Sequence, residues 1–202
     1  MKKIVTIEAR MTSTRLPGKV LMPLLGKPVL ERMVERIKRA KKIDGIVVAT
    51  TINDADDLIV DLCNRLNVSV FRGSEYDVLG RVLGAAEALA ADIIIELTGD
   101  CPLIDPSHID EMIDYYLEGQ YDYASNRLEL GLPDGFDVQV FSCENLKKIS
   151  HLTNDPIDRV HVSCFFYNNP QLFKIGKKKI SVNDLSYFPE LAVTLDEQED
   201  YE

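Results

Sequence analysis

The stretch Arg10-Met-Thr-Ser-Thr-Arg15-Leu-Pro-Gly-Lys19 decides how the rest of the chain is interpreted. It follows Ile4-Val-Thr-Ile7, whose apolar and β-branched residues predict a buried strand. The stretch combines three cations, three hydroxyl side chains and a Pro-Gly turn. Backbone N–H groups and hydroxyls at a strand end can donate hydrogen bonds to phosphate, and cations neutralise its charge. The stretch therefore predicts a loop that binds a polyphosphate, with a solvated basic loop as the alternative.

Neither familiar glycine-rich phosphate motif occurs in the sequence. The pattern G-x-x-x-x-G-K-[ST] is absent, and so is G-x-G-x-x-G. The predicted phosphate loop is therefore of another kind, built on cations and hydroxyls.

Composition limits the class of protein. A chain of 202 residues is long enough for one domain with a substantial core, and we expect a single domain over residues 1–202. The net charge of −10 argues against a nonspecific nucleic-acid binder, because affinity for the phosphate backbone comes from Lys and Arg.

The four cysteines lie far apart and form no C-x-x-C, so they predict neither a zinc site nor a disulfide framework. No signal peptide or apolar run long enough for a membrane span is evident, which predicts a cytoplasmic protein with no membrane partner.

Strand-like and helix-like segments alternate through the first half of the chain. The pattern predicts strands at 4–7, 45–50, 68–71 and 93–97, and helices at 31–42, 55–66, 78–91 and 108–117. This alternation is typical of right-handed βαβ units in a mostly parallel α/β sheet. Ligands of such sheets lie beyond the carboxyl ends of the strands. We therefore expect the 10–19 loop, the Arg72-Gly73 turn and Asp100 at one rim.

The second half is less regular. Its apolar pattern predicts a strand at 136–141, a short helix at 144–152, an apolar segment at 160–167 and a final strand at 191–195. The chain stops at Glu202, within what looks like the acidic first turn of a helix, so we expect a C-terminal helix that is truncated or missing.

Two carboxylates follow predicted strands. Asp100 follows Ile93–Leu97, and Asp196 follows Leu191–Leu195. Carboxylate oxygens at one rim suit Mg²⁺, which takes oxygen ligands and keeps waters and phosphate oxygens. A helix N-cap is the alternative for each aspartate alone.

Several motifs together resemble a known family. The matching segments are Ile7–Lys19, Gly26-Lys27-Pro28, Val48-Ala49-Thr50 and Gly99-Asp100-Cys-Pro102. They resemble the cytidylyltransferases that activate acidic sugars, the CMP-sialate and CMP-KDO synthetases. The segments Gly99–Leu103, Asp134–Phe141 and Arg159–Val162 are most similar to spore-coat polysaccharide biosynthesis proteins of the SpsF type. The resemblance implies a three-layer, Rossmann-like nucleotidyltransferase fold related to the GT-A fold.

The resemblance also implies roles for individual residues. It assigns the CTP phosphates to Arg10, Ser13, Arg15 and Lys19, the cytosine to the backbone around Ala9 and to Arg72, and Mg²⁺ to Asp100 and Asp196. Arg15, Lys19 and Asp100 would be the catalytic residues, because neutralising charge on the phosphates carries such a reaction.

The substrate-side residues are less specific. Arg159 and His161 could recognise a substrate carboxylate, with a structural histidine bonded to backbone as the alternative. Asp137 could contact a sugar, while Asp134-Gly-Phe-Asp137 could also be a plain hairpin turn.

The function implied is cytidylyl transfer from CTP to an acidic sugar or similar small acceptor for surface polysaccharide. A hydroxyl of the acceptor attacks the α-phosphorus and pyrophosphate leaves. We also consider a homodimer as the assembly of the protein. One alternative is a GT-A-type glycosyltransferase, although its usual D-x-D is not matched at Gly99-Asp100-Cys101. Another is a nucleotide-binding protein without turnover.

Overall fold

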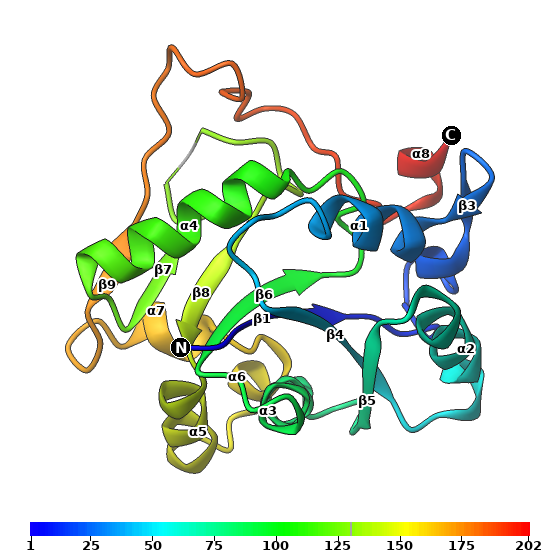
Figure 1. Ribbon diagram of the computed structural model, residues 1–202, viewed down its shortest axis with the longest axis horizontal. Coiled ribbons are helices and arrows are strands. Elements are labelled where there is room, and N and C mark those ends of the chain that lie inside the picture. Colours follow the sequence, from blue (N-terminus) through cyan, green and yellow to red (C-terminus); the bar gives the residue numbers. More distant parts are fainter. Residues whose placement is uncertain (130) are drawn as a thin grey trace.

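A seven-stranded sheet runs through the protein, with helices on both faces (Figure 1). The computed structural model describes residues 1–129 and 131–202. The strand order is β5-β4-β1-β6-β8-β7-β9. The first four strands in this order are parallel, and β8 runs antiparallel to both β6 and β7. The predicted three-layer α/β fold with a mostly parallel sheet is therefore confirmed.

The parallel half of the sheet is built from βαβ units. Its strands are β1 (Lys3–Glu8), β4 (Gly45–Thr51), β5 (Ser69–Gly73) and β6 (Ile93–Thr98). The helices are α1 (Val29–Ile37), α2 (Asp57–Leu66), α3 (Val78–Ala88) and α4 (Pro106–Gly119). Two short 3₁₀ helices, η1 (Lys19–Leu21) and η2 (Asp54–Asp56), and a small hairpin of β2 (Pro23–Leu24) and β3 (Lys27–Pro28) lie in the connections.

Of the remaining elements, three strands extend the sheet, three helices cover one face of it, and the last helix lies beside the β2–β3 hairpin (Figure 1). They are β7 (Tyr123–Ser125), β8 (Gln139–Ser142), β9 (Ile175–Lys177), α5 (Cys143–Leu152), α6 (Pro156–Val160), α7 (Cys164–Asn168) and α8 (Gln198–Tyr201). None of the helices in the described part of the chain is long and apolar enough to cross a membrane.

Alternation along the strands divides the core between the two faces. Val5 and Ile7 of β1 pack in one cluster with residues of α1, α2 and α4. Ile4 packs on the opposite face with residues of α3 and α5. Successive side chains of a strand point to opposite faces, so a strand buried on both faces reads as continuously apolar.

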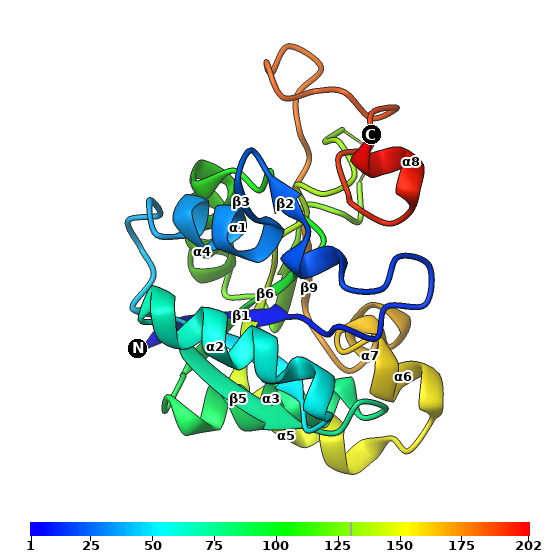
Figure 2. The ribbon, with the colours of Figure 1, turned by 90° about the vertical axis from the view of Figure 1, so that its right-hand side faces the viewer.

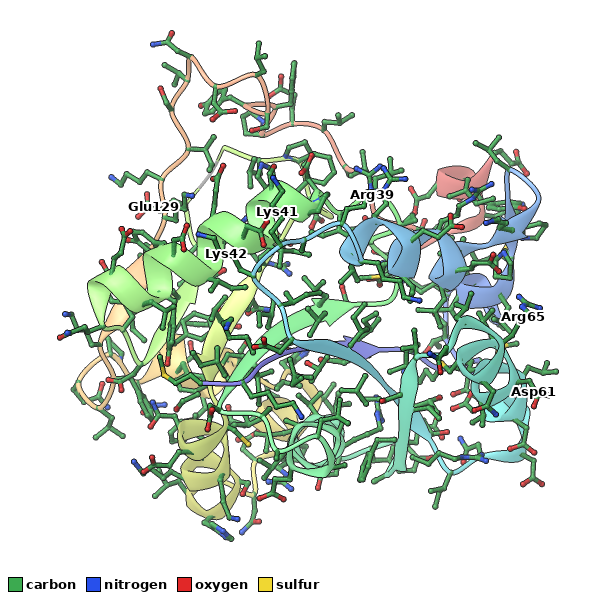
Figure 3. The ribbon with its side chains drawn as sticks, in the orientation of Figure 1. Arg39, Lys41, Lys42, Asp61, Arg65 and Glu129 are labelled. Carbon is green, nitrogen blue, oxygen red and sulfur yellow. The ribbon has the colours of Figure 1, made fainter. Side chains whose placement is uncertain are left out.

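Charged contacts support the layer formed by α1, α2 and α4. The backbone N–H groups of Lys41 and Lys42 each donate a 2.9 Å hydrogen bond to Asp110 of α4, and both lysines lie beside that helix in Figure 3. Arg65, labelled at the end of α2, forms a 3.0 Å ion pair with Glu31 of α1. These contacts lie away from the carboxyl ends of the strands.

Three predictions about elements need correction. The predicted strand at 191–195 is wrong: the segment forms an isolated bridge between Asp134 and Ala192. Residues 136–138 precede β8, so the strand predicted at 136–141 starts later, and α1 covers 29–37 instead of 31–42. Of residues 191–195 only Leu195 is buried, and none of residues 38–42 is buried, so the sequence pattern alone did not fix where these elements lie.

Candidate active site

A cavity of about 650 Å³ opens at the carboxyl ends of β1 and β6. Its walls come from the loop after β1, the loop between β5 and α3, the residues after β6, His161 and Asp196. Figure 2 shows the loop after β1 between the C-terminal segment on one side and α6 on the other. We call this space the first cavity.

Two buried or half-buried carboxylates hold the loop after β1 in place. Asp56 accepts a 2.7 Å hydrogen bond from the backbone N–H of Met11 and others from Thr50 and Thr51. Although burial opposes ionisation, these donors lower the pKa of Asp56. The Asp56 carboxylate thus fixes the start of the loop against the end of β4.

Glu75, from the loop between β5 and α3, fixes the next part of the loop. It accepts hydrogen bonds from the Thr12 hydroxyl, from Asn53 at 2.8 Å and from Arg10 at 3.0 Å. The Thr12 and Asn53 hydrogen bonds, and then the Arg10 charge, lower the pKa of Glu75. Arg10 therefore lines the first cavity already paired with a carboxylate.

Lys19 joins the two aspartates that the sequence singled out. Its ammonium Nζ lies 2.9 Å from Asp100 Oδ2 and 2.9 Å from Asp196 Oδ1. Lys19 is only 8% exposed, whereas Arg15, which forms a 2.8 Å ion pair with Asp196, is mostly exposed. The loop after β1, the end of β6 and the C-terminal segment thus meet at a single ammonium group.

Backbone hydrogen bonding places Asp196 beside Asp100. The N–H of Leu195 donates a 2.8 Å hydrogen bond to the carbonyl of Asp100. Asp196 therefore reaches the rim from an extended segment that pairs with a loop and not from the end of a strand. The helix cap is also a different residue, because Glu197 is the N-cap of α8.

Gly99 allows the residues after β6 to turn close to β1. A Cβ atom at this position would lie 2.6 Å from the backbone carbonyl oxygen of Glu8, which is closer than packing allows. Glycine is the residue that permits such an approach. Asp100 follows directly, so the close turn aims its carboxylate into the first cavity.

The charge on Asp100 is stabilised by its surroundings. Burial opposes its ionisation, but the hydrogen bond and charge of Lys19 lower its pKa. Asp100 is therefore ionised at neutral pH, as a metal ligand or phosphate-side carboxylate has to be.

The donor set fits a magnesium ion that also binds phosphate. No group of three or more His, Cys, Asp or Glu side chains suited to a metal occurs in residues 1–129 and 131–202. Asp100 and Asp196 nevertheless converge on one cationic position, now held by the Lys19 ammonium. Mg²⁺ often takes one or two protein carboxylates and completes its octahedron with waters and phosphate oxygens. The metal assignment of these two residues stays a prediction.

The first cavity collects most of the residues named from the sequence. Its lining includes Ala9, Arg10, Ser13, Arg15, Lys19, Asp100, His161 and Asp196. These residues lie far apart in the chain and line one cavity, as expected if the carboxyl ends of the parallel strands meet at one edge of the sheet.

Three other residues named from the sequence lie outside this lining. Arg72 donates hydrogen bonds to the backbone carbonyls of Thr51 and Asn53, at 2.9 and 2.8 Å, and ties β5 to β4. The structure thus shows Arg72 bracing β5 against β4, and its assignment to the cytosine stays a prediction.

Arg159 and Asp137 are engaged in contacts of their own. Arg159 pairs with Asp77, the N-cap of α3, and donates to the carbonyl of Ser150. Asp137 forms a 3.4 Å ion pair with Arg127, and burial raises its pKa to about 6. Arg159 therefore joins α6 to α3 and α5, and Asp137 lies beside the loop after β7.

The sequence analysis missed two carboxyl groups next to the first cavity. Glu8 of β1 lines this cavity, and Glu96 of β6 lines a second cavity beside it. Each is the one acidic residue of a strand that is otherwise mostly apolar, and that departure from the pattern is the signal that could have identified them.

Comparison with known proteins agrees with this architecture. A family model described as cytidylyltransferase matches residues 4–202. The spore coat polysaccharide biosynthesis protein SpsF of Bacillus subtilis is 35% identical over 201 residues, covering 97% of this chain and 82% of that protein. An 8-amino-3,8-dideoxy-manno-octulosonate cytidylyltransferase of Shewanella frigidimarina is 36% identical over 137 residues, covering 64% of this chain and 54% of that protein.

A solved structure extends the likeness to the whole fold. The structure of a cytidylyltransferase from Leptospira borgpetersenii superposes with a TM-score of 0.93 at 36% identity, covering 100% of this chain and 84% of that one. Fold and site define a nucleotidyltransferase. The chain belongs to the cytidylyltransferase family.

Proposed function

We propose that this protein transfers the cytidylyl group of CTP to a hydroxyl of an acidic sugar or similar small acceptor, for surface polysaccharide synthesis. The observation that carries the proposal is Lys19, whose ammonium joins Asp100 and Asp196 in the wall of the first cavity. Family membership supports the cytidylyl group, and the names of the SpsF and octulosonate relatives support a sugar acceptor.

The triphosphate would lie along the loop after β1. Arg15 is mostly exposed at the cavity wall and is free to move from Asp196 to a phosphate oxygen. Lys19 is nearly buried, so it would act as a fixed positive charge. Charge-assisted hydrogen bonds from such groups are stronger than neutral ones.

Asp100 and Asp196 would hold Mg²⁺ beside the phosphates. The metal would supply charge neutralisation and a template for the reacting oxygens. Lys19 must then release at least one of its two carboxylates, and its ammonium becomes available to a phosphate oxygen.

The side chains of this protein act mainly by positioning. The acceptor hydroxyl oxygen forms a bond to the α-phosphorus and releases its proton to solvent, while the bond to pyrophosphate breaks and negative charge develops on the leaving oxygens. Arg15 and Lys19 would stabilise that charge, which is how enzymes of phosphoryl transfer gain most of their rate.

Pyrophosphate release provides the test. The enzyme would be incubated with CTP, Mg²⁺ and each of a panel of sugar acids, including 3-deoxy-manno-octulosonate and its 8-amino-3,8-dideoxy counterpart. We expect CTP-dependent pyrophosphate with at least one sugar acid and none with Asp100→Asn. Release of a nucleoside diphosphate from a nucleotide sugar, with no pyrophosphate from CTP, would favour a glycosyltransferase instead.

A further inference from the structure

A second cavity of about 690 Å³ adjoins the first. Four residues line both cavities, namely Glu8, Thr98, Val160 and His161. The second cavity extends from them over β6, β7 and β8, beneath α6 and α7. A molecule held there has one end next to the place where the triphosphate would lie.

The inner wall of the second cavity carries two neighbouring carboxyl groups, those of Glu8 and Glu96. In the pairing of β1 with β6, Thr6 lies opposite Glu96 and Glu8 lies opposite Thr98, so Glu8 and Glu96 are on one face of the sheet. Glu96 is only 4% exposed. Burial and the neighbouring Glu8 carboxyl group raise the pKa of Glu96.

The two carboxyl groups each have one oxygen that lacks a hydrogen-bond donor among the described residues. These oxygens, Glu8 Oε1 and Glu96 Oε2, are both buried. Two neighbouring ionised carboxylates repel each other, so such a pair holds one proton between them. The Glu8–Glu96 pair is therefore a buried group with a net charge of about −1.

Few cations approach this pair. The charged and titratable groups around it are Arg81 of α3, Asp100 after β6, Tyr123 of β7, Arg127 after β7, His161 after α6, and Cys164 and Tyr167 of α7. Arg81 is buried and donates to the backbone carbonyls of Ala49 and Ser74. Arg127 is 62% exposed and paired with Asp137. No salt bridge to Glu8 or Glu96 occurs among the described residues.

We propose that the second cavity holds the acceptor of cytidylyl transfer and that the Glu8–Glu96 pair binds an ammonium group of that acceptor. The inference rests on the proposed function and narrows its acceptor to amino-bearing sugars. A carboxylate of the acceptor would then face Arg127 at the outer part of the cavity, away from the two glutamates.

Charge and hydrogen-bond capacity favour an ammonium group over the alternatives. A carboxylate next to the pair would meet like charge in a poorly solvated place, which is costly. A hydroxyl has one proton to donate, whereas an ammonium has three and also supplies the opposite charge. When the ammonium binds, the proton shared by Glu8 and Glu96 passes to solvent and both carboxylates remain ionised.

Polar groups beside the pair suit the rest of a sugar. The Gln139 side-chain oxygen accepts hydrogen bonds from Tyr123 at 2.6 Å and from Ser163 at 2.5 Å, which fixes its amide in the cavity wall. Tyr167 and Asn168 of α7 also line the cavity. Amides, hydroxyls and aromatic edges of this kind are the usual partners of sugar hydroxyls.

Calorimetry with two matched probes tests the proposal. The probes are 3-deoxy-manno-octulosonate and 8-amino-3,8-dideoxy-manno-octulosonate, which differ by an amine in place of one hydroxyl. At about pH 8 we expect the wild-type protein to bind the amino probe at least about tenfold more tightly, the size of one added charge-assisted hydrogen bond. We expect its affinity to rise with pH and a proton to be released into the buffer on binding.

Three variants separate this role from a structural one. Glu96→Gln keeps the shape of the side chain and should reduce the preference for the amino probe to within about threefold. Glu8→Gln should reduce the preference for the amino probe in the same way, and it replaces Glu96→Gln in the test if that variant fails to fold. Glu144→Gln, at an exposed position of α5, should retain the preference.

The outcomes distinguish this inference from the proposed function. Equal binding of both probes, binding of neither, or a preference that survives in both glutamine variants would overturn the inference. Tight binding of the amino probe without pyrophosphate release from CTP would overturn the proposed function and leave the ammonium site standing. Pyrophosphate release from CTP with 3-deoxy-manno-octulosonate alone would support the proposed function and overturn the ammonium site.

Discussion

The backbone N–H of Leu195 donates a 2.8 Å hydrogen bond to the carbonyl oxygen of Asp100, and this contact brings the C-terminal segment to the end of β6. Asp196, the next residue, therefore shares the Lys19 ammonium with Asp100. The site is assembled by a contact between residues about half the chain apart. The charged side chains to which we assign the chemistry, those of Lys19, Asp100 and Asp196, are paired with one another in the fold.

Removing the central ammonium should weaken nucleotide binding. Losing one charge-assisted contact costs roughly 1.5–3 kcal/mol, so Lys19→Ala should lower the affinity for CTP by more than about tenfold. Lys147→Ala removes an exposed ammonium that pairs with Glu87, and it should leave the affinity unchanged. Calorimetry measures both, and a Lys19→Ala protein that binds CTP normally would place the triphosphate elsewhere.

Replacing either aspartate by asparagine should abolish turnover. Asp100→Asn and Asp196→Asn keep the size of the side chain but remove a charge that Mg²⁺ and Lys19 would share. Pyrophosphate release should fall to background in both variants while circular dichroism shows a folded protein. Full turnover in Asp196→Asn would remove that residue from the metal site.

Asp100 should also contribute stability at neutral pH. Its pKa is lowered in the folded protein by Lys19, so its ionised form stabilises the fold above its unfolded pKa near 3.8. That contribution is lost as the pH falls below this value. Asp100→Asn should therefore be destabilised relative to the wild type at pH 7 and less so at pH 3, as measured by urea unfolding. A variant more stable than the wild type at pH 7 would mean that repulsion from Asp196 outweighs the contact with Lys19.

The Glu8–Glu96 pair should make the fold less stable as the pH rises. Burial raises the pKa of Glu8 from 4.5 to about 7, and burial together with Glu8 raises that of Glu96. The folded state then holds protons that the unfolded chain releases, so the free energy of unfolding falls between about pH 4.5 and pH 7. Glu96→Gln should flatten this fall in urea unfolding at pH 5 and pH 8. If the free energy of unfolding of Glu96→Gln fell with pH as steeply as that of the wild type, groups other than this pair would cause the fall.

The anchor of the loop after β1 should matter for both fold and site. Asp56→Ala leaves the Met11 N–H and the Thr51 hydroxyl without their buried acceptor. Since several hydrogen bonds to one ionised group are lost, we expect a cost of about 3 kcal/mol or more in the free energy of unfolding. Asp61→Ala, on the exposed side of α2, is the matched control, and its unfolding midpoint should hardly change.

Periodicity and composition could predict the parallel half of the fold, because β1, β4 and β6 are continuous apolar runs separated by helices of ordinary length. They could also predict that the loop after β1 and Asp100 lie at the same edge of the sheet, since both follow such strands. The three-residue strands β7 and β9 were missed because so short a run has no readable period.

Side-chain partners could not be predicted in the same way. Arg72 was assigned to the cytosine through the family resemblance and Arg159 to a substrate carboxylate on residue type, and neither assignment anticipated the backbone carbonyls and Asp77 that these side chains contact. These partners come from other elements, and only the packed fold brings them together. Glu8 and Glu96 were readable as polar breaks in apolar strands, but their proximity depends on the register between β1 and β6.

The most direct test of the central claim is calorimetry of nucleoside triphosphate binding in the presence of Mg²⁺. The account predicts that CTP binds more tightly than ATP, GTP and UTP, and that Lys19→Ala loses most of this affinity. ATP or GTP bound as tightly as CTP would contradict the assignment of this site to cytidylyl transfer.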